Sequence, residues 1–210
     1  MIILDFGSGE TCQNDYRTVE RMIHELAAVD PHRKAIIKWQ LFTEVPAKVR
    51  PLDRELYLYA VEHARELGYQ TTASVFDRES LDFLLSTGPP FVKIAARPYL
   101  YPLISRIPPT MQTMVSAPSA AKWNELRIDH GHRSLIVLCC IAEYPATVAS
   151  YRGQYGGLLH YGISDHTEGL ALYHKYKPVV WEKHYCLPDS TGPDAAGFAI
   201  RPEELEEVLR

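Results

Sequence analysis

Two histidines in the last quarter of the chain are candidates for binding a metal ion. His166 and His184 each follow a β-rich segment, and these two segments are the last of their kind in the sequence. If the segments are neighbouring strands, the imidazoles converge, and imidazole nitrogen suits a metal such as Mn²⁺, Zn²⁺ or Co²⁺. Asp165 and Glu182 are then candidates to orient the ligands. The alternative is that both histidines are hydrogen-bonded residues at the rim of a sheet.

Two lysines are candidates for binding an anion. Lys38 and Lys93 end or lie within β-rich runs, where a lysine is costly unless its charge is paired. Two such lysines near hydroxyl groups favour a pocket for phosphate or carboxylate. Two alternatives stay open. The lysines could form ion pairs with acids at the strand ends, or one of them could be the Schiff-base lysine of an aldolase.

These side chains need a scaffold that brings distant parts of the chain to one place. Short β-branched or apolar runs alternate with helical patterns throughout the sequence. The predicted strands cover 2–6, 35–38, 70–73, 91–94, 112–116, 134–139, 158–162 and 178–182. The predicted helices lie near 16–29, 53–67, 78–86, 100–106, 120–128, shortly after Pro145, 167–175 and 202–209. Asp77 is the predicted N-cap of the third helix.

Eight strand–helix units in series predict an α/β fold with a parallel sheet, and eight strands close a (β/α)₈ TIM barrel. With 210 residues, we expect a compact barrel in one domain, 1–210, with short connections. An open doubly wound sheet is the alternative, although no GxGxxG follows the first strand. In a barrel, the lysines, histidines and acids at the strand ends share one rim.

Composition excludes several classes of protein. The chain is 46% hydrophobic and 23% charged with a net charge of -4, which gives no reason to expect nucleic-acid or membrane binding. No apolar run approaches the roughly 20 residues that span a bilayer, and the N-terminus lacks a signal-peptide pattern. The four cysteines form no CxxC pair, so we expect reduced thiols and a cytoplasmic protein.

Several motifs together resemble the sialic acid synthases. The run YGISDHTEG at 161–169 resembles their GYSDHTxG motif, WEKHYCL at 181–187 resembles EKHFTL, and TGPD at 191–194 resembles the GPD segment. Shorter matches in family order are KWQ at 38–40 to KFQ, VFD at 75–77 to TPFD, KIA at 93–95 to KIAS, and EYP at 143–145 to SEYP. The combination of SDHT, EKH and GPD at these separations makes the resemblance specific, and it covers nearly the whole chain.

The resemblance implies a transferase of carbohydrate biosynthesis. Phosphoenolpyruvate would add to a sugar such as N-acetylmannosamine, or to another aldehyde, in a metal-assisted, aldol-like step that gives a 2-keto acid and phosphate. The implied metal ligands are His166 and His184, with Mn²⁺ expected and Mg²⁺, Co²⁺ or Zn²⁺ as alternatives. The residues implied to hold phosphoenolpyruvate are Lys38, Lys93, Ser116 and Ser164, with Ser74 where the family often has Thr. Those implied to face the sugar are Gln40, Tyr144 and Asp194. The catalytic candidates are Lys38, Lys93, Glu182 and Asp165.

The departures from the family pattern fall mainly on the acceptor side. Asp5 replaces the Glu of the family's AEIG segment, and its NHNG segment has no counterpart. ARP at 96–98 stands in place of SGE, which removes a carboxylate. Family members usually continue into an antifreeze-like domain, whose arginine reaches the sugar site of a partner subunit, and the sequence to Arg210 lacks it. Arg97 is a candidate replacement for that arginine, and a homodimer would form through barrel faces.

These observations favour a phosphoenolpyruvate-dependent condensing enzyme with an altered acceptor. Two alternatives remain. The first is a non-catalytic descendant that binds a sugar phosphate or a partner protein, motivated by the lost carboxylate. The second is a metal-dependent aldolase that uses pyruvate on the same barrel.

Overall fold

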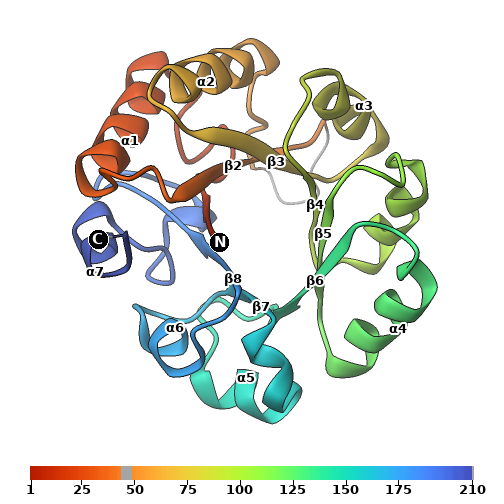
Figure 1. Ribbon diagram of the computed structural model, residues 1–210. Coiled ribbons are helices and arrows are strands. Elements are labelled where there is room, and N and C mark those ends of the chain that lie inside the picture. Colours follow the sequence, from red (N-terminus) through yellow and green to blue (C-terminus); the bar gives the residue numbers. More distant parts are fainter. Residues whose placement is uncertain (44–48, 210) are drawn as a thin grey trace.

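The computed structural model describes residues 1–43 and 49–209. In it, eight parallel strands close into a barrel in the order β1 to β8, and helices surround the barrel (Figure 1). The strands are β1 Ile2–Asp5, β2 Ala35–Leu41, β3 Gln70–Val75, β4 Val92–Ile94, β5 Thr113–Ala117, β6 Leu135–Cys140, β7 Gly162–Asp165 and β8 Val180–His184. This arrangement confirms the predicted TIM barrel and excludes the open sheet.

The outer layer contains both α-helices and shorter 3₁₀ segments. The α-helices are α1 Tyr16–Val29, α2 Arg54–Glu66, α3 Arg78–Ser86, α4 Ala120–His130, α5 Val148–Tyr155, α6 Ala171–Tyr176 and α7 Pro202–Leu209. The 3₁₀ segments are η1 Pro98–Arg106, η2 Gly156–His160 and η3 Pro193–Ala195. No helix in residues 1–43 and 49–209 is long and apolar enough to cross a membrane.

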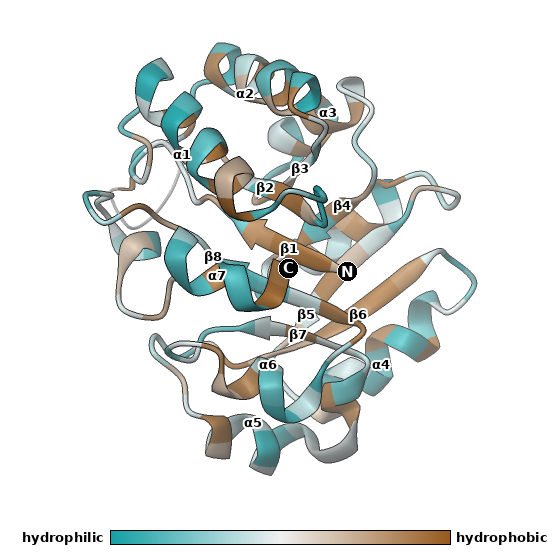
Figure 2. Ribbon diagram, turned by 60° about the vertical axis from the view of Figure 1, so that its left-hand side comes forward, coloured by the Kyte–Doolittle hydropathy of each residue, from teal (hydrophilic) through white to brown (hydrophobic). Residues whose placement is uncertain are grey.

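Local sequence explains where the helices begin and which face they bury. Asp77 caps α3 by accepting a hydrogen bond from the Ser80 backbone N–H, as predicted, because a side-chain oxygen satisfies an amide left free in the first turn. The buried residues of α1 recur at helical spacing and pack against the barrel; they are Val19, Met22, Ile23 and Leu26. Figure 2 shows the result, with hydrophobic strands inside and hydrophilic outer helix faces.

The inside of the barrel has an apolar end and a polar end. Side chains alternate along a strand, so residues two apart point the same way. An inner apolar cluster fills the half nearest the strand starts, and its buried members are Ile3, Phe91, Met114, Leu138 and Val180. Each of these apolar residues is followed, two positions later in the sequence, by an inward side chain that is polar or carries a thiol. These side chains are Asp5, Lys93, Ser116, Cys140 and Glu182. The strand ends therefore carry the chemistry.

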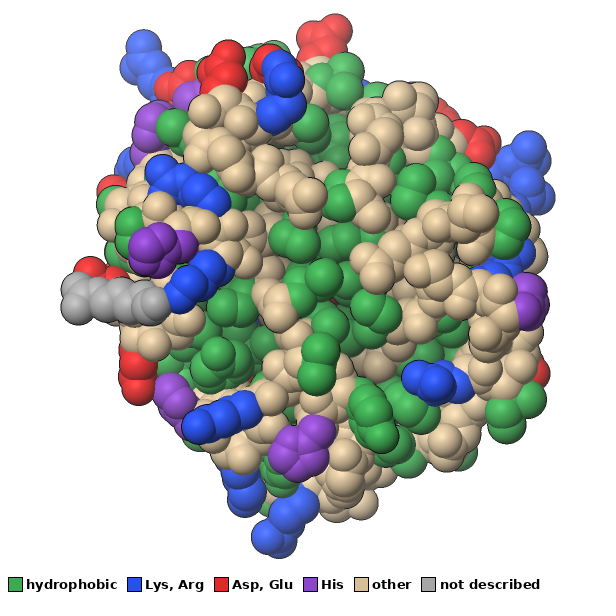
Figure 3. Space-filling view, viewed as in Figure 1, with side chains coloured by type: hydrophobic (Ala, Val, Ile, Leu, Met, Phe, Trp, Pro, Cys, Tyr) green, Lys and Arg blue, Asp and Glu red, His purple; other side chains and the backbone are tan. Residues whose placement is uncertain are grey.

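Figure 3 views the opposite end of the barrel, which carries the N-terminus. Hydrophobic side chains gather around the centre of this face, and charged side chains lie mainly around its edge (Figure 3). Met1 and Val179, which directly precede β1 and β8, are 49% and 68% exposed. The polar pocket described below opens at the other end of the barrel.

The structure differs from the prediction in the bounds of several elements, most clearly at the seventh strand and the fourth helix. Strand seven was expected at 158–162, but β7 is Gly162–Asp165, and 158–160 belong to η2. The apolar Leu158 and Leu159 resemble a strand, yet Leu159 reaches the core from a helical turn. The fourth predicted helix is the 3₁₀ segment η1, because Pro102 inside it cannot donate a backbone hydrogen bond.

Candidate functional site

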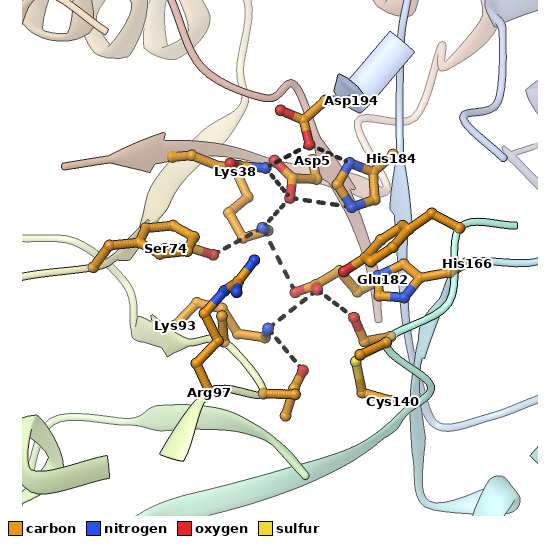
Figure 4. Close-up of a pocket in the computed structure, with 18 of the residues that line it drawn as sticks. Asp5, Lys38, Ser74, Lys93, Arg97, Cys140, His166, Glu182, His184 and Asp194 are labelled. Carbon is orange, nitrogen blue, oxygen red and sulfur yellow. Dashed lines mark hydrogen bonds and ion pairs between the residues drawn. The ribbon is translucent and has the colours of Figure 1, made fainter. Parts of the chain in front are cut away.

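A cavity of about 430 Å³ lies at the carboxyl ends of the strands. Every strand contributes at least one lining side chain: Asp5, Lys38, Gln40, Ser74, Lys93, Ser116, Cys140, Ser164, Glu182 and His184. The loops after the strands add Arg97, Tyr144, His166, Asp194 and several apolar residues. In TIM barrels this end of the strands is where active sites form. Figure 4 shows the labelled side chains converging on the cavity.

Lys38 is buried in the floor of the pocket and is held by three groups. Its Nζ donates to Asp5 Oδ2 at 2.5 Å and to Ser74 Oγ at 2.9 Å, and Glu182 Oε2 lies 4.0 Å away (Figure 4). Burial lowers the pKa of Lys38, but the carboxylates of Asp5 and Glu182 outweigh burial and raise it above its ordinary value. Lys38 is therefore charged. A Schiff-base nucleophile must be neutral, so this environment argues against Lys38 as an aldolase lysine.

Lys93 forms a second buried pair beside the first. Its Nζ lies 3.1 Å from Glu182 Oε1 and donates to Ser116 Oγ at 2.9 Å. Ser164 Oγ donates to the same Glu182 oxygen at 2.8 Å. Burial raises the pKa of Glu182, but Lys38 and Lys93 reverse this effect and hold it below its ordinary value. The ion pairs that the sequence left as an alternative thus exist, and each lysine also has a serine hydroxyl beside it.

His166 is buried in the form that a metal ion requires. Its Nδ1 is 2.6 Å from the Ile141 carbonyl oxygen. Because a carbonyl only accepts, Nδ1 carries the proton and Nε2 keeps its lone pair. Burial, followed by the charge of His184, lowers the pKa of His166 to about 3. His166 is therefore neutral at physiological pH.

His184 lies beside His166, with 5.4 Å between the ring centroids. Its Nδ1 is 3.2 Å from Asp194 Oδ1, close enough for an ion pair, although their alignment makes no hydrogen bond. Its Nε2 is 3.8 Å from Asp5 Oδ2. Burial lowers the pKa of His184, but the two carboxylates outweigh burial and raise it above 6.5. His184 is therefore the more readily protonated of the two histidines.

Gln40 joins the two carboxylates that flank His184. Its Nε2 donates to Asp5 Oδ2 at 3.1 Å and to Asp194 Oδ1 at 3.0 Å. The amide therefore links β1 and β2 to the loop that carries Asp194, which is distant in sequence. This link fixes the two acids on either side of the imidazole.

The two histidines fit a metal ion that takes only part of its coordination from the protein. Among the described residues, no group of three or more His, Cys, Asp or Glu side chains is arranged to hold a metal. The pair nevertheless has the usual arrangement of ligand histidines, because a carbonyl and a carboxylate face their Nδ1 atoms. The buried Glu182 Oε2 and His184 Nδ1 have no hydrogen-bond partner within the described part of the chain.

Asp165 is the one site candidate that the structure does not bring into the pocket. Ser164 and His166 take the inward positions, so Asp165 points outward, toward the helices. It accepts hydrogen bonds from Thr167 and from Trp181 Nε1 at 3.0 Å, and it lies 3.5 Å from Lys183 Nζ. Asp165 therefore lies outside the pocket lining, and its contacts hold the loop after β7 against β8.

The other candidates all line the pocket, and three further features were missed. Cys140 alternates with Cys139 along β6, and its side chain therefore lines the pocket. Burial raises the pKa of its thiol to about 11, so it is not a thiolate. Asp5, which the resemblance identifies only as the replacement of a Glu, contacts both Lys38 and His184. Phe198 packs against His166 and His184 from a loop that carries no sequence signal.

Comparison with known proteins gives one family match and two curated relatives. A family model described as the NeuB family matches residues 24–210. An uncharacterised protein of Methanocaldococcus jannaschii is 25% identical, with 75% of this chain and 52% of that protein aligned. The spore coat polysaccharide biosynthesis protein SpsE of Bacillus subtilis is also 25% identical, with 74% and 46% aligned. The chain thus spans about half the length of the curated relatives it matches.

Solved structures share the same barrel. The N-acetylneuraminic acid (sialic acid) synthetase of Leptospira borgpetersenii, in complex with citrate, has a TM-score of 0.79 at 21% identity, covering 99% of this chain and 80% of that one. A putative spore coat polysaccharide biosynthesis protein E of Chromobacterium violaceum has a TM-score of 0.76 at 21% identity, and the match covers 99% of this chain and 72% of that one. A phospho-2-dehydro-3-deoxyheptonate aldolase of Thermotoga maritima has a TM-score of 0.66 at 12% identity, and the match covers 100% of this chain and 67% of that one. At these identities the likeness establishes the fold.

Proposed function

Because the chain belongs to the NeuB family, we propose that it is a phosphoenolpyruvate-dependent synthase. It adds the donor to a sugar or other aldehyde and gives a 2-keto acid and phosphate. One observation carries the proposal: two buried lysines, each with a serine hydroxyl, lie in the same strand-end pocket as a pair of buried histidines. The likeness to a sialic acid synthetase structure supports the barrel that this chemistry needs.

The floor of the pocket supplies the groups that phosphoenolpyruvate, a small dianionic or trianionic donor substrate, needs for binding. Lys38 with Ser74 and Lys93 with Ser116 present ammonium and hydroxyl donors on neighbouring strands. Charge-assisted hydrogen bonds of this kind hold phosphate and carboxylate groups. Asp5 and Glu182 keep both lysines in place before the donor arrives. This preorganisation reduces the reorganisation needed when the donor binds.

The reaction requires one new carbon–carbon bond and the loss of phosphate. The methylene carbon of phosphoenolpyruvate attacks the aldehyde carbon, and the aldehyde oxygen takes up a proton to become a hydroxyl. Water adds to the second carbon of the donor, the bond from that carbon to the phosphate oxygen breaks, and the two protons of the water pass to the new hydroxyl and to the phosphate. The lysines stabilise the charge that moves onto the leaving phosphate. Glu182 Oε2, which accepts no hydrogen bond within the described residues, can accept one from the attacking water.

His166 and His184 would hold a divalent metal, with Mn²⁺ first and Mg²⁺, Co²⁺ or Zn²⁺ as alternatives. When bound, the metal supplies Lewis-acid polarisation of the aldehyde oxygen. Asp194 and the Ile141 carbonyl orient the two imidazoles. Gln40 and Asp194, on the same side of the pocket, are placed to bind hydroxyl groups of the acceptor.

Calorimetric titration with phosphoenolpyruvate, with and without Mn²⁺, tests the donor pocket. We expect the native protein to bind and Lys93→Met to lose at least tenfold in affinity, because the ammonium group is gone. Since Lys93→Met removes the nearest cation from the buried Glu182, the double variant Lys93→Met, Glu182→Gln serves to retain the fold. Lys175→Ala, an exposed lysine outside the pocket, is the matched control. Equal affinity in all four proteins would contradict the assignment.

A further inference from the structure

The charged side chains that line the pocket pair with one another, with one exception. Lys38 pairs with Asp5, Lys93 with Glu182, and His184 with Asp194. Arg97 also lines the pocket. Within residues 1–43 and 49–209, its guanidinium has neither a hydrogen bond nor an ion pair. The pocket thus has a cation whose partner is not supplied by the described side chains.

Arg97 has a fixed place at the mouth of the pocket. It follows β4, its backbone N–H donates to the Ala95 carbonyl at 2.7 Å, and its own carbonyl accepts from Leu100 in the first turn of η1. Figure 4 shows the side chain pointing into the pocket rather than away from it. The charge of Arg97 acts on Tyr144: burial raises the pKa of the Tyr144 hydroxyl, and Arg97 opposes part of that rise. The two residues therefore face one cavity.

The surroundings of Arg97 differ from those of the two lysines. Lys38 and Lys93 are buried to 1% and 2% exposure and have serine hydroxyls beside them, whereas Arg97 is exposed at the rim. Ala95 and Ala96, which directly precede Arg97, line the same pocket, as do the apolar residues Phe42 and Phe76. An arginine beside apolar walls interacts more strongly with an anion than one surrounded by water. Its planar fork suits two oxygens of a phosphate or carboxylate group.

We propose that Arg97 binds an anionic group on the acceptor, so that the substrate is an aldehyde carrying a phosphate or carboxylate distant from its reacting end. The assignment of this anion to the acceptor rests on the proposed function, whereas the anion site at Arg97 does not. Lys38 and Lys93 in the floor serve the donor, and Arg97 at the mouth serves the far end of the second substrate. Arg97 is thus a specificity-determining residue.

Binding of matched charged and neutral sugars tests this inference without requiring turnover. D-arabinose 5-phosphate is compared with D-arabinose, and D-glucuronate with D-glucose, by calorimetry in the absence of phosphoenolpyruvate. We expect the native protein to prefer at least one charged sugar over its neutral counterpart by about tenfold or more. Arg97→Ala should abolish that preference and Arg97→Lys should keep part of it. Arg106→Ala, an exposed arginine at the other end of η1 and outside the pocket, should leave the preference unchanged.

Several results would overturn the inference, and they are separate from failure of the donor site. Equal binding of charged and neutral sugars, no binding of either, or a preference that survives Arg97→Ala would each do so. Displacement of the charged sugar by phosphoenolpyruvate would place it in the floor instead. Loss of phosphoenolpyruvate affinity in Arg97→Ala, with sugar binding unaffected, would assign the arginine to the donor. Native protein that prefers a charged sugar but fails to bind phosphoenolpyruvate would contradict the proposed function alone.

Discussion

The Nζ of Lys93 lies 3.1 Å from Oε1 of Glu182, and both side chains are buried inside the barrel. The contact joins β4 to β8 across the interior, since neither strand is the other's neighbour. Lys38 approaches the other oxygen of the same carboxylate at 4.0 Å. One acid thus positions the two cations that we assign to the donor.

Replacing Glu182 should therefore destabilise the protein. Glu182→Gln leaves two buried lysines with less compensation, and breaking a buried pair costs about 3–5 kcal/mol. Urea unfolding at pH 7 measures the loss. The double variant Lys93→Met, Glu182→Gln should be more stable than Glu182→Gln alone, because it removes both charges. A double variant as unstable as the sum of its single variants would show that the two residues do not interact.

The ionisation of Glu182 should make the free energy of unfolding depend on pH. The pKa of Glu182 is held below its ordinary value of 4.5 in the folded protein. Its stabilising contribution is therefore complete above pH 4.5 and is lost as the pH falls through the lower, folded value. Unfolding free energies between pH 3 and 6 should fall less steeply on acidification in Glu182→Gln than in the native protein. Identical slopes would contradict the ionised state assigned to Glu182.

Metal affinity should rise with pH because of His184. The pKa of His184 is raised above 6.5, so protons compete with a metal for this imidazole, whereas His166, with a pKa of about 3, is already neutral. Calorimetry with Mn²⁺ should show tighter binding at pH 8 than at pH 6. His184→Ala and His166→Ala should each abolish it, and His174→Ala, an exposed histidine outside the pocket, should not. Binding that survives both pocket substitutions would remove the histidines from the metal site.

Asp165 should matter for stability and not for the chemical step. Asp165→Asn weakens the contacts with Lys183, Trp181 and Thr167, which are buried, and leaving a buried lysine unpaired costs about 3–5 kcal/mol. The melting temperature should fall, while the kcat of the folded fraction should change by only a few-fold. A loss of kcat by two orders of magnitude with an unchanged melting temperature would show that Asp165 is needed for catalysis instead.

Gly162 should resist substitution because of the barrel interior. A Cβ at this position would lie 2.6 Å from Leu138 Cδ2, a contact that forces one side chain to move. Overpacking of this kind costs about 1–3 kcal/mol. Gly162→Ala should lower the unfolding free energy by that amount, and adding Leu138→Val should recover part of it. No recovery in the double variant would place the strain elsewhere.

The sequence was sufficient to predict the barrel because alternation and helical periodicity are local properties. It also placed Lys38, Lys93, His166 and His184 at one rim, since parallel strands end on the same side. The direction of a single side chain was harder to predict. Asp165 lies outside the pocket because it alternates with Ser164 and His166, and the direction of each side chain depends on where the strand begins.

The remaining features depend on packing between distant segments. Leu158 and Leu159 satisfy a strand pattern and a helical turn equally well, and only the tertiary fold decides between them. Asp194 meets His184 and Gln40 because the loop after β8 folds back over the barrel. That Arg97 has no partner among the described residues is likewise a property of the assembled pocket, because the sequence shows only a change of residue type at that position.

The most direct test of the donor assignment is product formation. Purified protein with Mn²⁺ and phosphoenolpyruvate is mixed with each aldehyde of the charged and neutral set, and phosphate and 2-keto acid are measured together. The account predicts equal amounts of the two products, formed only when an aldehyde is present, and loss of both in Lys93→Met, Glu182→Gln. No release of phosphate from phosphoenolpyruvate, with keto acid formed when pyruvate replaces phosphoenolpyruvate in the mixture, would contradict this assignment and favour an aldolase.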